Sequence, residues 1–172
     1  MKVIALVGFS GSGKTTLAEL IIAGLCARGY SVGSVKKIHA ENFALDTPGT
    51  NTDRHRQAGS VQTTALGLQE TDILFPRVLG IDELLAHYDQ DFVVLEGVRD
   101  PRIPALVTAN VAEDLARKDP GNICAVAGRL AQGAGAGAVL ARPDGLMVPL
   151  IDALADPVSL VDFVERAAAA WQ

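Results

Sequence analysis

Eight residues near the start of the chain match the phosphate-binding pattern G-x-x-x-x-G-K-[ST]. They are Gly8, Phe9, Ser10, Gly11, Ser12, Gly13, Lys14 and Thr15. Successive backbone N–H groups curl around an anion only where the chain takes positive φ, which accounts for the three glycines of this loop. Lys14 would reach the β- and γ-phosphates of a nucleotide, and the Thr15 hydroxyl would ligate Mg²⁺.

The residues on either side of the loop support the same prediction. The run 3–7 is apolar and rich in β-branched residues, which predicts a buried strand, and residues 16–28 carry apolar side chains at helical spacing. A helix that begins at the loop adds the partial positive charge of its N-terminus. We therefore predict a nucleotide site in which Lys14 also acts in catalysis. Its phosphate-contacting residues are Gly8, Ser10, Gly11, Ser12, Gly13, Lys14, Thr15 and Thr16.

A second candidate residue is Glu96, which directly follows the apolar run 92–95 and precedes Gly97. A phosphate-binding loop of this kind needs an acid at the carboxyl end of a neighbouring parallel strand to hold Mg²⁺ through water. An acid in this position could also simply end the strand at the solvent, but the phosphate loop favours the metal-side role. We predict Glu96 as the second catalytic residue and, together with Thr15, as a metal ligand.

Polar residues crowd into the segment 39–59, which follows the second predicted strand. They include His39, Glu41, Asp46, Asp53, His55 and Arg56. Each one alone fits a solvated loop, but the segment follows a strand adjacent to the phosphate-loop strand, where a switch or substrate loop belongs. We therefore predict that Asp46 and Arg56 contribute to cofactor binding, and that Lys36 faces the γ-phosphate or a second anionic ligand. The spacing of His39 and His55 does not favour a zinc site.

The elements that would position these residues alternate between strands and helices. Strands are predicted at 2–7, 32–38, 61–66, 71–75, 92–95, 103–107 and 123–127, and helices at 14–28, 52–58, 81–88 and from 157 to 168. A Gly/Ala-rich tract at 131–138 predicts a loop. The alternation predicts an α/β protein with a three-layer P-loop NTPase fold, in which helices flank a mostly parallel sheet. The length of 172 residues predicts a single domain over 1–172.

Composition excludes several classes of partner. The net charge is −5, so no electrostatic footprint for nucleic acid or an anionic membrane is expected. No apolar stretch approaches the roughly 18 residues of a membrane helix, and the first apolar run enters the phosphate loop too early to be a signal peptide. Cys26 and Cys124 lie far apart and are expected to be buried thiols. These features predict a cytoplasmic protein.

Four segments together resemble the MobB family of molybdopterin-guanine dinucleotide biosynthesis adaptor proteins. They are the phosphate loop through Leu17, the strand and loop 35–39, the segment from 46–49 through 53–59, and the strand end 92–99. The phosphate loop is shared with many unrelated proteins. The Pro-Gly followed by Arg-His-Arg-x-Ala-Gly in the third segment is far more specific. The similarity covers most of the first hundred residues.

The resemblance implies a protein that binds GTP and Mg²⁺, hydrolyses GTP weakly and forms a homodimer. It would assist a molybdenum cofactor guanylyltransferase of the MobA type, with a molybdopterin-type anionic ligand as a further contact. Two positions depart from the family pattern. Residues 37–40 replace a usual His-rich run, and Asn51 stands where an aspartate usually follows the Pro-Gly. These departures fit a paralogue that serves a related cofactor.

Three other functions share parts of these motifs. A small-molecule P-loop kinase would need an arginine-bearing lid, and the tract from 130 to 141 is a poor one. A metallochaperone GTPase would need a His- or Cys-rich segment, and a ligase of the dethiobiotin-synthetase type shares the Glu-Gly after a strand. The guanine-reading motif N-K-x-D is absent at 108–110, so the expectation of GTP rests on the resemblance alone.

Overall fold

The computed structural model describes residues 1–41, 43–118, 121–142 and 144–171. Contacts divide the chain into two compact units. The larger one comprises Met1–Lys37 and Tyr88–Gln172, and the smaller one comprises Ile38–His87. A single domain over the whole chain therefore remains a prediction, and each unit is described by itself.

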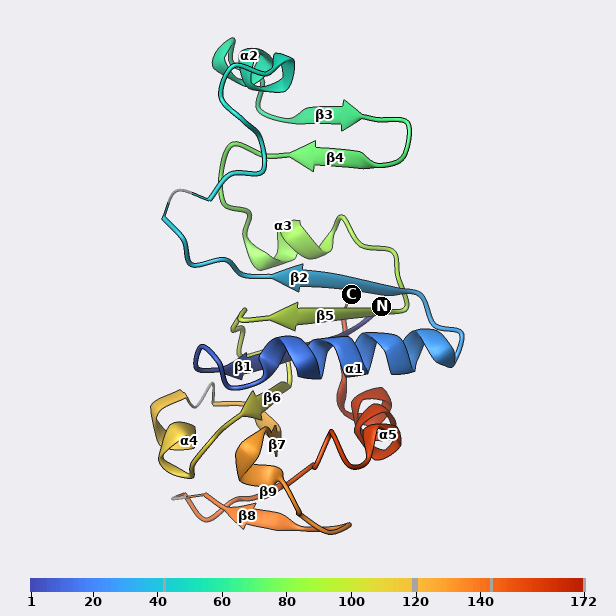
Figure 1. The fold of residues 1–172 in the computed structure, drawn as a ribbon, viewed down its shortest axis with the longest axis vertical. Coiled ribbons are helices and arrows are strands. Elements are labelled where there is room, and N and C mark those ends of the chain that lie inside the picture. The colour runs from blue at the N-terminus through green and yellow to red at the C-terminus, as the bar shows by residue number, and fades with distance from the viewer. Residues whose placement is uncertain (42, 119–120, 143, 172) are drawn as a thin grey trace. The chain divides into compact units, whose positions relative to one another are not determined.

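The larger unit is built on a mostly parallel sheet in the order β2-β5-β1-β6-β7 (Figure 1). Its strands are β1 (Lys2–Gly8), β2 (Val32–Lys36), β5 (Phe92–Glu96), β6 (Ala105–Thr108) and β7 (Ile123–Ala127). A two-residue strand, β10 (Ala169–Ala170), pairs antiparallel with the start of β1, where β6 has not yet begun. The phosphate-loop strand therefore lies inside the sheet, which explains why its sequence is apolar on both faces.

One face of the sheet packs against α1 (Lys14–Ala27) and α5 (Pro157–Ala167). Strand residues such as Ile4 and Leu6 join apolar residues of both helices in one buried cluster. The helix residues of this cluster are Leu17, Ala18, Ile21, Leu25, Leu160, Val161 and Val164. Asp156 is the N-cap of α5 and its side chain accepts a hydrogen bond from the Ser159 N–H, with Pro157 in the first turn of the helix.

The opposite face is covered at β6 and β7 by a second buried cluster. Val107 and Val126 point to this face and pack with Leu115 of α4 (Glu113–Lys118) and Val148 of β9 (Met147–Pro149). β9 pairs antiparallel with β8 (Val139–Ala141). The predicted fold class, a mostly parallel sheet flanked by helices, is confirmed. The short α4, β8, β9 and β10 were not predicted, because each carries too few residues to show a periodic pattern.

The smaller unit contains a helix, a hairpin and a second helix. α2 (Asn51–Gln57) is capped by Thr50, whose side chain accepts from the Asp53 N–H. β3 (Thr63–Leu66) and β4 (Thr71–Leu74) pair antiparallel, and α3 (Ile81–Leu85) follows. These elements confirm the predicted short helix, two short strands around Gly67 and second helix.

Two local predictions need correction. Cys26 was expected to be buried but is exposed, because it lies on the solvent side of α1, whereas Cys124 is partly buried. The predicted strand at 103–107 begins instead at Ala105, after Pro104, and the Ala105 N–H donates to the Asn122 carbonyl.

The tract 131–138, predicted as a loop, forms turns between a single 3₁₀ turn, Arg129–Ala131, and β8.

Gly24 lets α1 and α5 approach closely, which generates a stability prediction. A Cβ at Gly24 would lie 2.3 Å from Cγ2 of Val161, a stiff β-branched residue that is 3% exposed. Gly24→Ala should therefore lower the free energy of unfolding by about 1–2 kcal/mol, because overpacking outweighs the helix-propensity gain of roughly 1 kcal/mol. In a Val161→Ala background the same change should stabilise the protein. Urea unfolding of the four proteins of this cycle measures both effects, and stabilisation by Gly24→Ala alone would contradict this packing.

Candidate nucleotide-binding site

The phosphate loop joins β1 to α1 with two left-handed glycines. Gly11 has φ 73° and Gly13 has φ 95°, and Gly13 is the N-cap of α1. Gly13 makes no side-chain cap and the first turn of α1 has no acidic residue, so no side chain of the helix itself neutralises its positive end. This arrangement favours a bound phosphate.

Gly8 is needed for a different reason from the one predicted. Its φ is not positive, but a Cβ there would lie 2.2 Å from Oγ1 of Thr108 and 2.5 Å from its carbonyl oxygen. Thr108, at the end of β6, also lies 2.6 Å from the Ser12 hydroxyl, and both side chains are buried. The Ser12 hydroxyl donates to the Phe9 carbonyl at 2.8 Å. Close packing against Thr108 therefore stabilises the loop. The Ser12 side chain contributes to this stabilisation through its contacts with Thr108 and Phe9.

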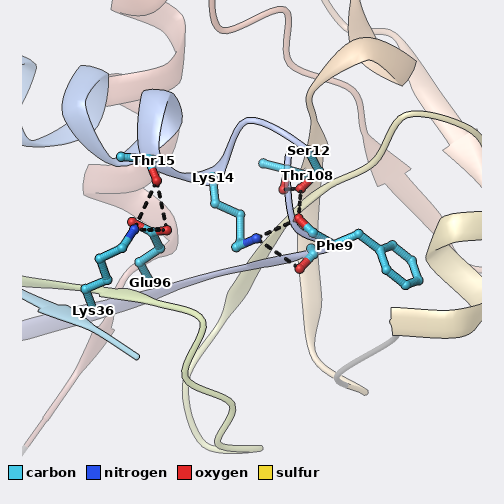
Figure 2. A network of polar contacts seen from close by, with 8 residues as sticks. Phe9, Ser12, Lys14, Thr15, Lys36, Glu96 and Thr108 are labelled. Carbon is cyan, nitrogen blue, oxygen red and sulfur yellow. Dashed lines mark hydrogen bonds and ion pairs between the residues drawn. The ribbon is translucent and has the colours of Figure 1, made fainter. Parts of the chain in front are cut away.

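The side chains of Lys14 and Thr15 meet different partners, since the Thr15 hydroxyl faces Glu96 and Lys36 and the Lys14 ammonium faces Phe9 (Figure 2). The Lys14 ammonium donates to the carbonyls of Gly8 and Phe9, at 3.1 and 2.7 Å. These contacts hold the ammonium against the backbone of the loop that would bind an anion. Ser10 is exposed in the loop and Thr16 is exposed in the first turn of α1, so both remain open to a ligand.

Thr15, Glu96 and Lys36 form a three-membered polar contact beside the loop (Figure 2). The parallel register pairs Glu96 with Leu6 on one side and with Lys36 on the other. The Thr15 hydroxyl donates to Oε1 of Glu96 at 2.9 Å, and the Lys36 ammonium contacts the same oxygen at 2.6 Å and the Thr15 hydroxyl at 3.1 Å. The structure thus brings together three residues that were predicted as site residues from separate segments of the sequence.

The charge of Glu96 is stabilised by these neighbours. Its side chain is only 12% exposed, and this burial acts to raise the pKa. The hydrogen bonds from Lys36 and Thr15, and the charges of Lys36 and Lys14, outweigh burial and lower the pKa of Glu96 below its ordinary value. Glu96 is therefore an anion near neutral pH, as a carboxylate on the metal side of a nucleotide must be.

The donor set at Thr15 and Glu96 fits Mg²⁺. A hydroxyl and a carboxylate oxygen lie 2.9 Å apart, and both are hard oxygen ligands of the kind that this ion prefers. Lys36 shows that the same two oxygens already accommodate a positive charge. In the described part of the chain, no group of three or more His, Cys, Asp or Glu residues could hold a metal ion.

Asp46 and Arg56, the other predicted site residues, belong to the smaller unit. Asp46 accepts from the Thr50 and Thr52 hydroxyls at 2.7 and 2.9 Å. Hydrogen bonds from Thr50 and Thr52 and the charge of Arg56 lower the pKa of Asp46, although burial acts against them. Arg56 pairs with Asp53 at 2.6 Å. The two predicted residues thus share one polar cluster, and their part in cofactor binding remains a prediction.

Two features of the site were not predicted from the sequence. The Arg117 guanidinium lies 5.1 Å from the ring centre of Phe9, so α4 contacts the phosphate loop through a cation–π pair. A cavity of about 150 Å³ also opens beside the loop, on the side of β6 and β7. Arg117 was missed because α4 was not predicted. The cavity was missed because its walls come from four separate segments.

Among the described residues, no helix is long and apolar enough to cross a membrane.

Comparisons with known proteins agree on one family. The family model described as molybdopterin guanine dinucleotide synthesis protein B matches residues 3–129. A molybdopterin-guanine dinucleotide biosynthesis adapter protein of Haemophilus influenzae is 33% identical over 109 residues, covering 60% of this chain and 61% of that protein. A probable protein of this kind from Bacillus subtilis is 30% identical over 128 residues, covering 72% and 74%.

Solved structures show the same fold. A MobB protein homologue from Bacillus stearothermophilus superposes with a TM-score of 0.65 at 26% identity, covering 97% of this chain and 98% of that chain. Bacillus subtilis MobB superposes with a TM-score of 0.69, covering 99% and 100%; at 23% identity this likeness concerns the fold alone. The matched region spans only about three fifths of the Haemophilus influenzae relative and of a further relative from Escherichia coli.

The pKa of Glu96 generates a prediction about pH. Because that pKa is lowered in the folded state, the stabilisation by Lys36 is present above the ordinary value of 4.5 and is lost as the pH falls through the folded-state pKa. Lys36→Met should lower the free energy of unfolding by on the order of 1 kcal/mol at pH 7, since the exposed ammonium is partly screened, and by less at pH 4. Urea unfolding at both pH values measures this, with Lys37→Met as the matched control. An equal loss at both pH values would contradict the ion pair.

Proposed function

The chain belongs to the family of molybdopterin guanine dinucleotide synthesis protein B, and from this we propose that it is a GTP-binding adaptor of molybdenum cofactor biosynthesis. In this proposal it binds GTP with Mg²⁺ and hydrolyses GTP weakly. It assists a molybdenum cofactor guanylyltransferase of the MobA type in attaching GMP to molybdopterin. The names of the relatives support the pathway, and the site supports the nucleotide.

The observation that carries the proposal is the meeting of Lys14, Thr15 and Glu96 around one helix N-terminus. The loop's backbone N–H groups would hold the phosphate oxygens, and the Lys14 charge would reach the β- and γ-phosphates. Thr15 and Glu96 would hold Mg²⁺, which supplies neutralisation of phosphate charge when bound. The lowered pKa of Glu96 keeps this carboxylate ionised for that task.

Weak hydrolysis is proposed because, among the described residues, the contacts of Thr15 and Glu96 include no arginine. Lys36 contacts Glu96, and Arg117 lies over Phe9. An arginine that neutralises transition-state charge raises the rates of such enzymes by orders of magnitude, and competent kinases turn over about 1–100 times per second. We expect the isolated protein to hydrolyse GTP below about 0.1 s⁻¹, with Arg54, Arg56 or Arg99 as residues that a partner would bring into place.

The assembly is also a proposal. The smaller unit exposes large apolar side chains on and beside its hairpin, including Leu66, Leu68 and Val78, which are 84%, 107% and 94% exposed. Exposed apolar groups of this size favour a protein contact, and we propose a homodimer that works in the cytoplasm. A molybdopterin-type anionic ligand is a further part of the proposal, and it rests on the family alone.

Lys14→Ala tests nucleotide binding and the adaptor role together. The loss of a charged contact to phosphate should cost roughly 2–3 kcal/mol, or about 30- to 150-fold in GTP affinity, without unfolding the protein. Calorimetric titration of GTP measures the affinity. Reconstituted guanylylation of molybdopterin, with the guanylyltransferase and with either wild type or variant, measures the assistance. Unchanged GTP affinity would exclude the proposed phosphate site. Rapid phosphoryl transfer by the wild type to a small-molecule acceptor would instead favour a kinase.

Glu96→Gln tests the metal-side carboxylate. The amide keeps the size of the side chain but removes its charge, so GTP binding in EDTA should persist while the gain in affinity on adding Mg²⁺ falls by about 10-fold or more. Titrations with and without Mg²⁺ measure this, and Glu41→Gln in the smaller unit is the matched control. A wild-type response to Mg²⁺ would move the metal-side role to Asp46 or Asp53.

A further inference from the structure

The cavity beside the phosphate loop has walls of two kinds. It runs from the loop along α1 to the carboxyl ends of β6 and β7 and to the segment after β9. The apolar wall consists of Leu17, Leu20, Ala153 and Leu154, and the polar groups are those of Asn110, Arg129, Gln132 and Asp152. In parallel α/β sheets, ligands bind outside the carboxyl ends of the strands. A cavity lined by apolar side chains and a few polar groups suits a heterocyclic base.

The backbone that follows β7 lies close to the phosphate loop. Gly128 has φ 86°, and a Cβ there would lie 2.8 Å from the Ala109 carbonyl and 3.3 Å from the Ser12 carbonyl. A side chain at position 128 would therefore push the following turn away from the phosphate loop. Because Gly11, Ser12 and Gly13 also line the cavity, a ligand whose phosphates lie on the loop has its next part at this opening.

Asp152 lines the cavity, and two backbone N–H groups hold its carboxylate. Its Oδ2 accepts from the Gly133 N–H at 2.7 Å and its Oδ1 accepts from the Ala155 N–H at 3.2 Å. The Ile151 N–H donates to the Val126 carbonyl at 2.9 Å, which ties the segment to β7. The hydrogen bonds from Gly133 and Ala155 lower the pKa of Asp152, so the group is an anion at neutral pH. A carboxylate oxygen has more than one lone-pair site, so both oxygens can accept again.

We propose that this cavity is the nucleobase site and that Asp152 selects guanine. Guanine presents two adjacent donors, N1–H and the 2-amino group, which match the two oxygens of a carboxylate. Adenine presents an acceptor at N1 and has no 2-amino group, so its edge would face the anion with a lone pair. Asp152 thereby supplies the guanine-reading function for which the chain carries no N-K-x-D motif. The inference rests on the proposed nucleotide binding and deepens it.

Nucleotide analogues test the assignment on the unmodified protein. Mg²⁺-bound GDP should bind about 10-fold or more tightly than IDP, which lacks only the 2-amino group, and at least 100-fold more tightly than ADP. Calorimetric titration of the three nucleotides gives these ratios directly. Equal affinity for GDP and IDP, or for GDP and ADP, would overturn the role of Asp152.

Asp152→Asn then asks whether this side chain is responsible. In the variant, the GDP to IDP ratio should fall toward 1, and XDP, whose 2-oxo group accepts from an amide, should gain about 10-fold or more relative to GDP. Asp156→Asn is the matched control, because it removes the same charge four residues along at the N-cap of α5, where asparagine also caps well. A variant that weakens all nucleotides equally and keeps the preference for GDP over IDP would show a merely structural role and overturn the proposal.

The outcomes separate this inference from the function on which it rests. If no nucleotide binds the wild type, or if Lys14→Ala leaves binding unchanged, the nucleotide site itself is wrong. If nucleotides bind through Lys14 but the base preference is absent or insensitive to Asp152→Asn, the nucleotide site stands and the base assignment is wrong.

Discussion

The parallel register of β2, β5 and β1 is the constraint on which the phosphate side of the site depends. It sets Glu96 between Leu6 and Lys36, directly beside the point where β1 turns into the phosphate loop. Thr15 reaches the same carboxylate from the first turn of α1. Because β5 and β1 are buried on both faces, a slip of this register would expose apolar side chains and separate the three groups. Core packing therefore fixes the distances within the candidate metal site.

The other side of the loop depends on close backbone contact. Thr108 packs against Gly8 and Ser12, and Gly128 approaches the same loop from the end of β7. These contacts place the turn after β7 and the segment around Asp152 next to the mouth of the loop. The two sides of the proposed site therefore lie over different strands of the sheet. The charged groups lie on the β5 side, and the cavity proposed for the base lies on the β6–β7 side.

The smaller unit carries chemistry of a different kind. Its polar cluster pairs Arg56 with Asp53 and surrounds Asp46 with hydroxyl groups, while its hairpin exposes large apolar side chains. A unit with few buried apolar residues and a prominent exposed set depends more on partners than the sheet does. We therefore regard it as the part through which the proposed adaptor would contact other molecules.

The sequence by itself determined the elements that rest on local patterns. The phosphate loop, the apolar strands around it and the helix after it follow from residue types at neighbouring positions, and Glu96 stands out because an acid follows an apolar run. Only the tertiary structure decided which distant residues meet. Nothing local in the sequence pairs Ser12 with Thr108, Arg117 with Phe9, or the phosphate loop with Asp152. The reason is that such contacts depend on strand order and on the close approach of backbones, which no local pattern encodes.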